Sequence, residues 1–182
     1  ISTIDATCPL VLKVHNEVRR HIAAGRHVFL VGHHGHPEVV GTAGQAPAGA
    51  TTIVESADMA FRVAAPEGPL AYATQTTLSV DDAEKIVAAL KARFPDIEGP
   101  RRADICYATS NRQAAAKLIA PGADIVLVIG SPQSSNSMRL VDTALAAGAP
   151  SMLVEDPFAF DVASLDQARI VGVTSGASTP ED

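Results

Sequence analysis

The stretch His27-Val-Phe-Leu-Val-Gly32 is matched 98 positions later by Ile125-Val-Leu-Val-Ile-Gly130. Each is a short apolar run that ends at a glycine, a pattern that predicts a buried strand. Each glycine also lies 24 positions after a cysteine, Cys8 in the first half and Cys106 in the second. A pattern that returns after so long a distance indicates two similar domains instead of a short-period solenoid.

Later landmarks of the two halves keep nearly the same offset. Thr52-Ile-Val-Glu55 matches Met152-Leu-Val-Glu155, and Ser79-Val-Asp-Asp82 matches Thr179-Pro-Glu-Asp182. The last of these stretches carries helix-start signals, a threonine cap followed by proline and two acids, but the sequence stops before a helix body. Because the sequence also begins without methionine, we expect a fragment of a longer protein.

Helical and strand-like segments alternate along both halves. Helices are predicted over residues 9–24, 56–63, 80–93, 111–119 and 136–147, with another after residue 37. Strands are predicted over residues 28–31, 52–55, 70–73, 125–129, 152–154 and 170–173. This alternation predicts an α/β fold with mostly parallel sheets covered on both faces. We expect two repeated α/β domains, residues 1–98 and 99–182, with a linker over residues 95–102.

The composition argues against several classes of protein. The 182 residues carry a formal net charge of −6, which argues against a general nucleic-acid or acidic-membrane surface. No apolar run reaches the roughly 18 residues that a transmembrane helix requires. Two cysteines do not make the disulfide framework of a secreted protein, so we expect a cytoplasmic setting without nucleic-acid or membrane partners.

Polar residues cluster where the predicted strands end. These loops are Gly32-His-His-Gly-His-Pro-Glu38, Thr74-Gln-Thr-Thr77, Gly130-Ser-Pro-Gln-Ser-Ser-Asn-Ser137 and Thr174-Ser-Gly-Ala-Ser178. In open α/β sheets, ligands bind outside the carboxyl ends of the strands. We therefore expect these four loops and the two cysteines, each just before a predicted helix, to converge on one site.

The serine- and asparagine-rich loops lie at predicted helix N-termini. Backbone N–H groups and the helix dipole favour an anion there, phosphate above all, and hydroxyl and amide groups add donors. Taken singly, Ser134, Asn136 and Ser178 are better explained as helix caps and turn formers. Their recurrence in both halves favours an anion site held by neutral donors and histidine.

The loop after the first predicted strand contains His33, His34, His36 and Glu38. These side chains suit a metal site, acid–base chemistry or a polar loop, and their spacing matches no known zinc pattern. Glu38 is a candidate proton donor. It is equally explained as a carboxylate in a first helical turn, where it interacts favourably with the helix dipole.

Cys8 and Cys106 have three interpretations. They are small buried hydrophobic residues, a redox pair, or ligands of one shared metal centre. Their equivalent positions in the repeat favour the third. Because iron–sulfur clusters need three or four cysteines, we expect a further repeat outside this sequence to supply another ligand, which predicts a three-lobed protein around one cluster.

These motifs together resemble the 4-hydroxy-3-methylbut-2-enyl diphosphate reductase family of the non-mevalonate isoprenoid pathway. Ser110 is commonly threonine in that family, and the stretch around Val40–Ala43 differs from the family's usual sequence. Neither difference removes a candidate site residue. The stretches that carry the resemblance occur in the family's order across nearly the whole sequence: Asp5–Val11, Gly32–Thr42, Thr74–Asp82, Asp104–Gln113, Gly130–Ser137 and Gly172–Glu181.

The resemblance implies a trefoil of three α/β domains around a central 4Fe–4S cluster held by three cysteines. Cys8 and Cys106 match two of these ligands, while the third belongs to an N-terminal domain that this sequence lacks. The resemblance also implies ferredoxin or flavodoxin as the electron donor. We expect the 182 residues alone to be inactive, because two of three cysteines hold a cluster poorly.

The implied reaction is the two-electron reductive dehydroxylation of a small allylic diphosphate to isopentenyl and dimethylallyl diphosphate. By match with the family, Glu38 supplies protons, with Thr76 in the relay and His36 beside it. The substrate-binding residues that the resemblance implies are His36, Thr76, Thr109, Ser134, Ser135, Asn136 and Ser178.

Two other functional classes stay open on the residues alone. A diphosphate-binding module without redox chemistry fits the loops but leaves the paired cysteines unexplained. A structural zinc protein fits the cysteines and histidines but not the serine- and asparagine-rich loops. Iron and sulfide, no metal, or zinc after anaerobic reconstitution would separate the three hypotheses.

Overall fold

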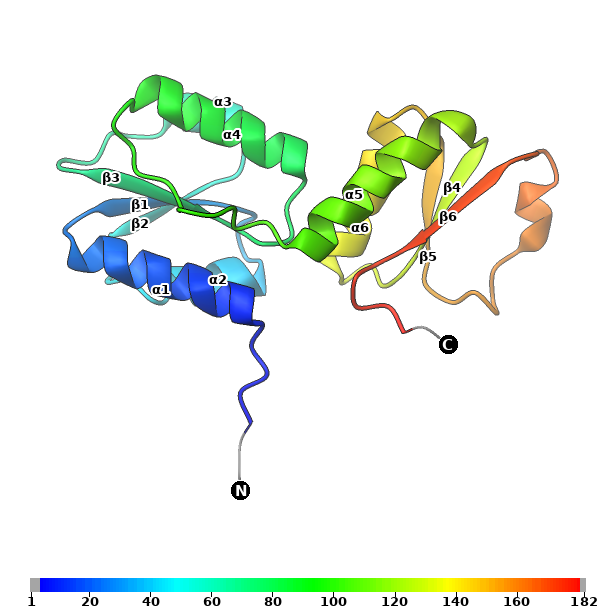
Figure 1. Ribbon diagram of the computed structural model, residues 1–182, viewed down its shortest axis with the longest axis horizontal. Helices are drawn as coiled ribbons and strands as arrows, with labels where there is room; N and C mark the ends of the chain where they lie inside the picture. The colour runs from blue at the N-terminus through cyan, green and yellow to red at the C-terminus, as the bar shows by residue number, and fades with distance from the viewer. Residues whose placement is uncertain (1–3, 181–182) are drawn as a thin grey trace. The chain divides into compact units, whose positions relative to one another are not determined.

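The computed structural model describes residues 4–180, and these form two compact units (Figure 1). The first unit contains the chain up to Thr76 together with Val80–Cys106, and the second contains Thr77–Ser79 and the chain from Tyr107 onward. Each unit has one three-stranded parallel sheet, which confirms the predicted repeat of α/β architecture. The expected domain boundary between residues 98 and 99 stays a prediction, because a compact unit is not by itself a folding domain.

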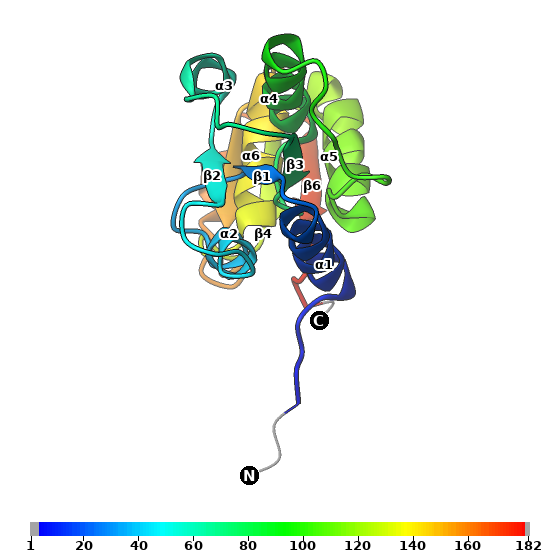
Figure 2. The same ribbon diagram turned by 90° about the vertical axis from the view of Figure 1, so that its left-hand side faces the viewer.

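In the first unit the sheet has the strand order β2-β1-β3 and carries helices on both faces. Figures 1 and 2 show α1 and α2 on one side of this sheet and α3 and α4 on the other. The elements are α1 Pro9–Ala23, β1 His27–Val31, α2 Pro37–Ala43, β2 Thr51–Val54, α3 Ala57–Arg62, β3 Leu70–Thr74 and α4 Val80–Arg93.

The alternation of side chains along β1 builds two separate apolar layers in this unit. Val28 and Leu30 point to one face and pack in one cluster with Val14 and Val18 of α1. Phe29 lies between them in sequence, points to the opposite face, and is also fully buried. A strand covered on both faces needs a continuous apolar run, which is the pattern that the sequence shows.

One of the buried polar side chains of the first unit is a histidine. His21, in the last turn of α1, is only 1 % exposed, and neither ring nitrogen has a hydrogen-bond partner. Burial lowers the pKa of His21, and the charge of Arg20 adds to this effect, while Glu98 and Asp104 oppose it and Arg26 supports it. The folded state therefore favours the neutral imidazole.

This buried histidine predicts a loss of stability in acid. With a folded-state pKa below the usual 6.5, the unfolded chain binds more protons, so stability is present above about pH 6.5 and falls as the pH drops. We expect the Tm of the chain to fall between about pH 7.5 and pH 5.5, and His21→Leu to make this fall smaller. Thermal unfolding followed by circular dichroism at a series of pH values measures the effect.

Three further histidines, His15, His27 and His36, also have a pKa lowered by burial. The slope of Tm against pH should therefore become smaller in His21→Leu without vanishing. Leu118 is 82 % exposed and carries no titratable group, so Leu118→Gln serves as the matched control that leaves the slope unchanged. An identical slope for the original chain and His21→Leu would show that the unfolded and folded states bind protons equally at this position.

The second unit repeats the topology of the first, with the strand order β5-β4-β6. Its elements are α5 Tyr107–Ile119, β4 Ile125–Ile129, α6 Ser135–Ala146, β5 Ser151–Val154 and β6 Val171–Ser175, with short 3-10 turns at Ala120–Gly122 and Val162–Leu165. Val126 and Val128 of β4 pack in one cluster with apolar side chains of α5 and α6. Helix α5 begins at Tyr107 and not at the predicted residue 111, because the chain turns into the helix directly after Cys106.

The opposite face of the second sheet is partly open within the described residues. Leu127, Met152 and Val173 are neighbours on this face, and Met152 and Val173 are 38 % and 62 % exposed. In the first unit the corresponding face carries α3 and α4. The helix predicted to start at Thr179 would run through residues 181–182, which lie outside the described residues. Among residues 4–180, no helix combines the length and the apolar character needed to cross a membrane.

Candidate active site

Glu38 is placed by the start of α2, directly after the loop that follows β1. His36 is the N-cap residue, and its Nδ1 accepts a hydrogen bond of 3.2 Å from the backbone N–H of Glu38. Pro37 follows at the first helical position, where its fixed φ angle and missing N–H cost nothing. The sequence His-Pro-Glu therefore fixes where the helix begins and puts Glu38 into its first turn.

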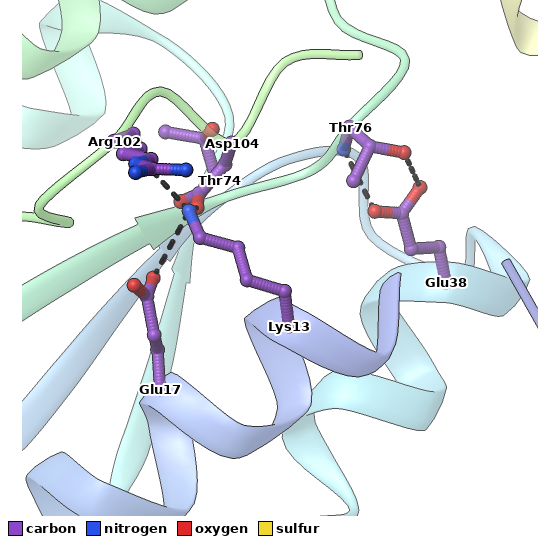
Figure 3. Close-up of polar contacts among 7 residues, drawn as sticks. All are labelled: Lys13, Glu17, Glu38, Thr74, Thr76, Arg102 and Asp104. Carbon is purple, nitrogen blue, oxygen red and sulfur yellow. Dashed lines mark hydrogen bonds and ion pairs between the residues drawn. The ribbon is translucent and has the colours of Figure 1, made fainter. Parts of the chain in front are cut away.

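Glu38 is joined to Thr76, which lies just beyond the end of β3. The backbone N–H of Thr76 donates to Oε1 of Glu38 at 2.7 Å, and the Thr76 hydroxyl donates to Oε2 at 3.0 Å (Figure 3). Thr76 is only 4 % exposed. The structure thus brings together two candidate catalytic residues that the sequence places at the ends of two different strands.

The surroundings of Glu38 raise its pKa above the ordinary value of 4.5. Burial is the largest cause, because it disfavours the charged carboxylate. The two hydrogen bonds from Thr76 favour the carboxylate and oppose the shift, while the negative charge of Asp104 adds to it. A carboxyl group with a raised pKa keeps a proton at a higher pH than free glutamate does, as a proton donor must.

A close approach of the α2 N-terminus to the end of β3 makes this contact possible. A Cβ atom on Gly32 would lie 2.7 Å from Cγ2 of Val39 and 3.0 Å from Cβ of Gln75. Gln75, which is 4 % exposed, accepts a hydrogen bond of 3.0 Å from the backbone N–H of His33 through Oε1. Gln75 therefore holds the histidine loop in place, a role that the sequence analysis did not assign.

Cys106 lies beside the same pair of residues. Its backbone N–H donates to the carbonyl oxygen of Thr76 at 2.9 Å. Cys8 is exposed and directly precedes α1, without a side-chain capping bond. Both cysteines are free thiols, and each directly precedes a helix, as the repeat predicts. The described residues therefore do not bury Cys8.

The described residues do not by themselves complete a metal centre. No group of three or more histidine, cysteine, aspartate or glutamate side chains among residues 4–180 is arranged to hold a metal ion. His36 caps α2, and the backbone N–H of His34 donates to Oε1 of Glu55 at 2.7 Å. The two cysteines offer thiol donors, but fewer than an iron–sulfur cluster needs.

In the second unit, the N-terminus of α6 and the loop after β6 border a small cavity. Ser134 caps α6, and its hydroxyl accepts a hydrogen bond of 3.3 Å from the backbone N–H of Ser137. The first turn of α6 carries no acidic residue, so its N–H groups remain favourable to an anion. The cavity, of about 200 Å³, is lined by Ile129, Gly130, Ser131, Ser134, Ser137, Glu155, Ser178, Thr179 and Pro180.

Three further candidates lie near the starts of the two helices of this unit. Asn136 is 6 % exposed, and neither its side-chain oxygen nor its side-chain nitrogen has a hydrogen-bond partner. Ser135 donates to the carbonyl oxygen of Thr77 at 3.3 Å, and Thr109 is buried in the first turn of α5. A buried amide without partners is costly, so a bound water or ligand that satisfies it would stabilise Asn136.

The candidate residues therefore form two groups, one in each unit. The first group contains Cys8, His36, Glu38, Thr76 and Cys106, and the second contains Thr109, Ser134, Ser135, Asn136 and Ser178. Contacts join several members within each group. That the two groups meet at one site stays a prediction.

Ser137 also lines this cavity, although its place in a serine-rich loop does not single it out in the sequence. It is 1 % exposed, and its hydroxyl has no hydrogen-bond partner. A Cβ atom on Gly130 would lie 2.9 Å from Cβ of Ser137 and closer still to its hydroxyl, and a Cβ on Gly176 would meet the same hydroxyl. Positions 130 and 176 must therefore both be glycine for the N-terminus of α6 to lie this close to the two loops.

Gly130→Ala is accordingly expected to lower the free energy of unfolding of the second unit by about 1–3 kcal/mol, the usual cost of overpacking a close contact. Ser137→Gly removes the opposing atoms, so the double variant should recover part of the loss. Gly122→Ala is the matched control, because a Cβ there meets nothing within 4 Å. Urea unfolding measures all four chains. Equal stability of Gly130→Ala and Gly122→Ala would contradict the close approach.

Comparison with known proteins identifies the family of this chain. The model of the LytB protein family matches residues 1–182. The chain belongs to the LytB protein family. A relative from Gluconobacter oxydans, named 4-hydroxy-3-methylbut-2-enyl diphosphate reductase, is 55 % identical over 98 % of the chain and 55 % of its own length. A relative of the same name from Bordetella pertussis is 53 % identical over 100 % of the chain and 56 % of its own length.

A solved structure of a LytB-like enzyme agrees with the fold. The E-1-hydroxy-2-methyl-but-2-enyl-4-diphosphate reductase from Plasmodium falciparum matches with a TM-score of 0.93 and 41 % sequence identity. The match covers 98 % of this chain and 56 % of that one. The chain thus spans about half the length of the curated relatives and the solved enzyme that it matches.

Proposed function

We propose that this chain supplies two α/β domains of a 4-hydroxy-3-methylbut-2-enyl diphosphate reductase. The names of relatives that are 53 % and 55 % identical support the activity. The observation that carries the proposal is the Glu38–Thr76 pair, a half-buried carboxyl group with a raised pKa that lies next to the backbone of Cys106. A reductase that protonates its substrate needs such a proton donor beside a cysteine that can bind its metal.

The proposed reaction removes the allylic hydroxyl group of (E)-4-hydroxy-3-methylbut-2-enyl diphosphate. Two electrons and two protons enter, the carbon–oxygen bond breaks, and the oxygen leaves as water. One proton joins the leaving hydroxyl and the other forms a new carbon–hydrogen bond. The position of that second protonation decides between isopentenyl and dimethylallyl diphosphate.

Cys8 and Cys106 are proposed as two of the three thiolate ligands of a 4Fe–4S cluster. Both are free, and they hold equivalent places before α1 and α5, which suits ligands that come from two repeats of one fold. The third ligand has to come from outside these 182 residues, in keeping with relatives about twice as long. Such a cluster, when bound, would supply electrons and a Lewis-acidic iron for breaking the carbon–oxygen bond.

Glu38 is proposed to hold and release the protons. Its raised pKa favours the protonated form of the carboxyl group, and the Thr76 hydroxyl at 3.0 Å can accept and pass on a proton. The hydroxyl bond also fixes the carboxyl plane, because both carboxyl oxygens are held by the same residue. His36 keeps α2 in register through its cap and is proposed to face the diphosphate as well.

The second unit is proposed to hold the diphosphate at the N-terminus of α6. Ser134, Ser135 and Asn136 offer hydroxyl and amide donors beside the N–H groups of the first turn of α6, and the side-chain NH2 of Asn136 would donate a hydrogen bond to a bound anion. Ser178 lines the same cavity, and Thr109 is proposed to lie close to the substrate. Glu155 is the acidic member of the cavity lining and is exposed, so solvent weakens its repulsion of an anion.

The surrounding partners follow from this chemistry. Two electrons delivered singly to a cluster call for a one-electron carrier, for which ferredoxin or flavodoxin is proposed. Free cysteines and an iron–sulfur cluster suit a reducing compartment, so a cytoplasmic location is proposed.

Anaerobic reconstitution with iron and sulfide tests the proposal. A full-length protein that contains this sequence should gain a broad visible absorption band, and the band should shift on addition of the hydroxy-diphosphate substrate. Cys106→Ser should lose the band, while the 182-residue chain alone should form little cluster and no product. A full-length protein that gains no band but binds diphosphate would instead be a binding module, and stoichiometric zinc would make it a structural zinc protein.

A further inference from the structure

A buried carboxylate lies two residues before Cys106 and has no part in the proposed chemistry. Asp104 is 2 % exposed and comes from the segment between α4 and α5. Its Oδ1 accepts a hydrogen bond of 2.7 Å from Nζ of Lys13 on α1, and its Oδ2 accepts one of 2.9 Å from the backbone N–H of Thr74 (Figure 3). Both carboxylate oxygens are thus used, which is what a buried charge requires.

Lys13 holds this segment at a second point. Its ammonium also donates to the carbonyl oxygen of Arg102 at 2.8 Å, and Oε2 of Glu17 lies 3.4 Å away (Figure 3). A lysine ammonium has three donors, and here they reach Asp104, Arg102 and Glu17. Helix α1 therefore fastens the segment before Cys106 through one side chain.

The same segment runs beside β3 and is attached to it stepwise. Glu98 pairs with Ala71 as an isolated parallel bridge, Asp104 accepts from Thr74, and Cys106 donates to Thr76. Between the bridge and α5 the chain has no helix or strand. Such a segment is mobile unless individual bonds hold it, and the bonds of Asp104 are the attachment next to Cys106.

We propose that Asp104, held by Lys13, is a positioning residue that fixes Cys106 against Thr76 and so sets the cysteine in place relative to Glu38. The proposal rests on the proposed role of Cys106 as a cluster ligand. Thr74 and Thr76 are two residues apart at the end of β3, and so are Asp104 and Cys106. Two hydrogen bonds, Thr74 to Asp104 and Cys106 to Thr76, therefore hold the segment before α5 in register with the end of β3. Thr76 in turn holds both oxygens of Glu38.

Asp104→Asn tests this role, because it keeps the shape of the side chain and removes the charge that attracts Lys13. Arg26→Gln is the matched control: it breaks the ion pair of Arg26 with Glu98 on the same segment, but that pair is partly exposed to solvent and contributes little. Hydrogen exchange in the metal-free full-length protein is measured first. We expect the amides around Cys106 to exchange about tenfold or more faster in Asp104→Asn, with those of β1 unchanged.

After anaerobic reconstitution, Asp104→Asn should release iron to a chelator about 10- to 100-fold faster than the original protein, as changes behind a metal ligand do. Arg26→Gln should match the original in both measurements. Faster exchange throughout the first unit would mean a purely structural role and overturn the proposal, as would unchanged exchange and unchanged iron release.

The two measurements separate this inference from the proposed function. If the unchanged full-length protein takes up no iron, the proposed function fails. The hydrogen exchange of Cys106 still decides whether Asp104 positions that residue. If the protein takes up iron and Asp104→Asn holds it equally well with equally slow exchange, the proposed function stands and the positioning role falls.

Discussion

Glu38→Gln in the full-length protein is expected to slow turnover about 10²- to 10⁴-fold, the usual contribution of a positioned general acid. Glutamine has nearly the same size, and its carbonyl oxygen can still accept a hydrogen bond from Thr76, so the local structure should persist. The amide has no proton to give at neutral pH. Single-turnover and steady-state rates with a chemical reductant, together with the visible spectrum, measure the effect.

The control for this variant is a second carboxylate near the same loop. Glu55 accepts a hydrogen bond of 2.7 Å from the backbone N–H of His34, but it is exposed. Glu55→Gln should therefore leave turnover within a few-fold of the original, because water can replace what it offers. Unchanged turnover in Glu38→Gln would remove Glu38 from the mechanism, and a lost absorption band would show that the variant disturbs the metal site instead.

The pH dependence of the reaction has a definite sign. In the proposed mechanism Glu38 acts as an acid, so the rate should fall as the pH rises through its pKa, which lies above the ordinary 4.5. A diphosphate bound as proposed would add negative charge and raise this pKa further. In Glu38→Gln the remaining slow rate should lose this dependence.

The strands and the helix starts were readable from the sequence because they depend on local patterns. Apolar runs such as Val28–Val31 and Ile125–Ile129 are largely buried, and His-Pro-Glu carries its own cap signal. The start of α5 was harder to predict from the sequence, because its first residues, Tyr107 to Ser110, show neither a capping side chain nor an apolar stripe.

The contacts that hold the candidate site were out of reach because they join distant segments. Sequence position put Glu38 and Thr76 at strand ends, but their two hydrogen bonds depend on how closely α2 approaches β3. Asp104 is harder still: aspartate is usually exposed, and its partner Lys13 lies 91 residues earlier in the chain. The sequence shows that Asp104 lies two residues before Cys106, but it does not show that Asp104 is buried.

The first unit also depends on one aromatic contact that has no equivalent in the repeat. Phe29 is fully buried, its ring stacks on Phe94 at a centroid distance of 5.4 Å, and the ring of His27 meets its edge at the same distance. At the equivalent position the second unit has Leu127, on a sheet face where Val173 is 62 % exposed. The same position in the repeat therefore has different surroundings in the two units.

Phe29→Ala is expected to lower the free energy of unfolding of the first unit by about 3–5 kcal/mol, because it leaves a cavity that the rigid sheet and α4 cannot fill. Phe29→Leu, which imports the residue of the second repeat, should cost clearly less. Leu127→Ala should fall near the lower end of about 2–5 kcal/mol, since its partly open surroundings can collapse or admit water.

The chain allows these losses to be assigned to one unit. It has no tryptophan and two tyrosines, Tyr72 in β3 of the first unit and Tyr107 at the start of α5 in the second. In a Tyr107→Phe background, tyrosine fluorescence during urea unfolding reports on the first unit alone. Phe29→Ala should shift this transition strongly, and Leu127→Ala should shift it little. If both substitutions shift it equally, the two units unfold as one, and the loss belongs to the whole chain.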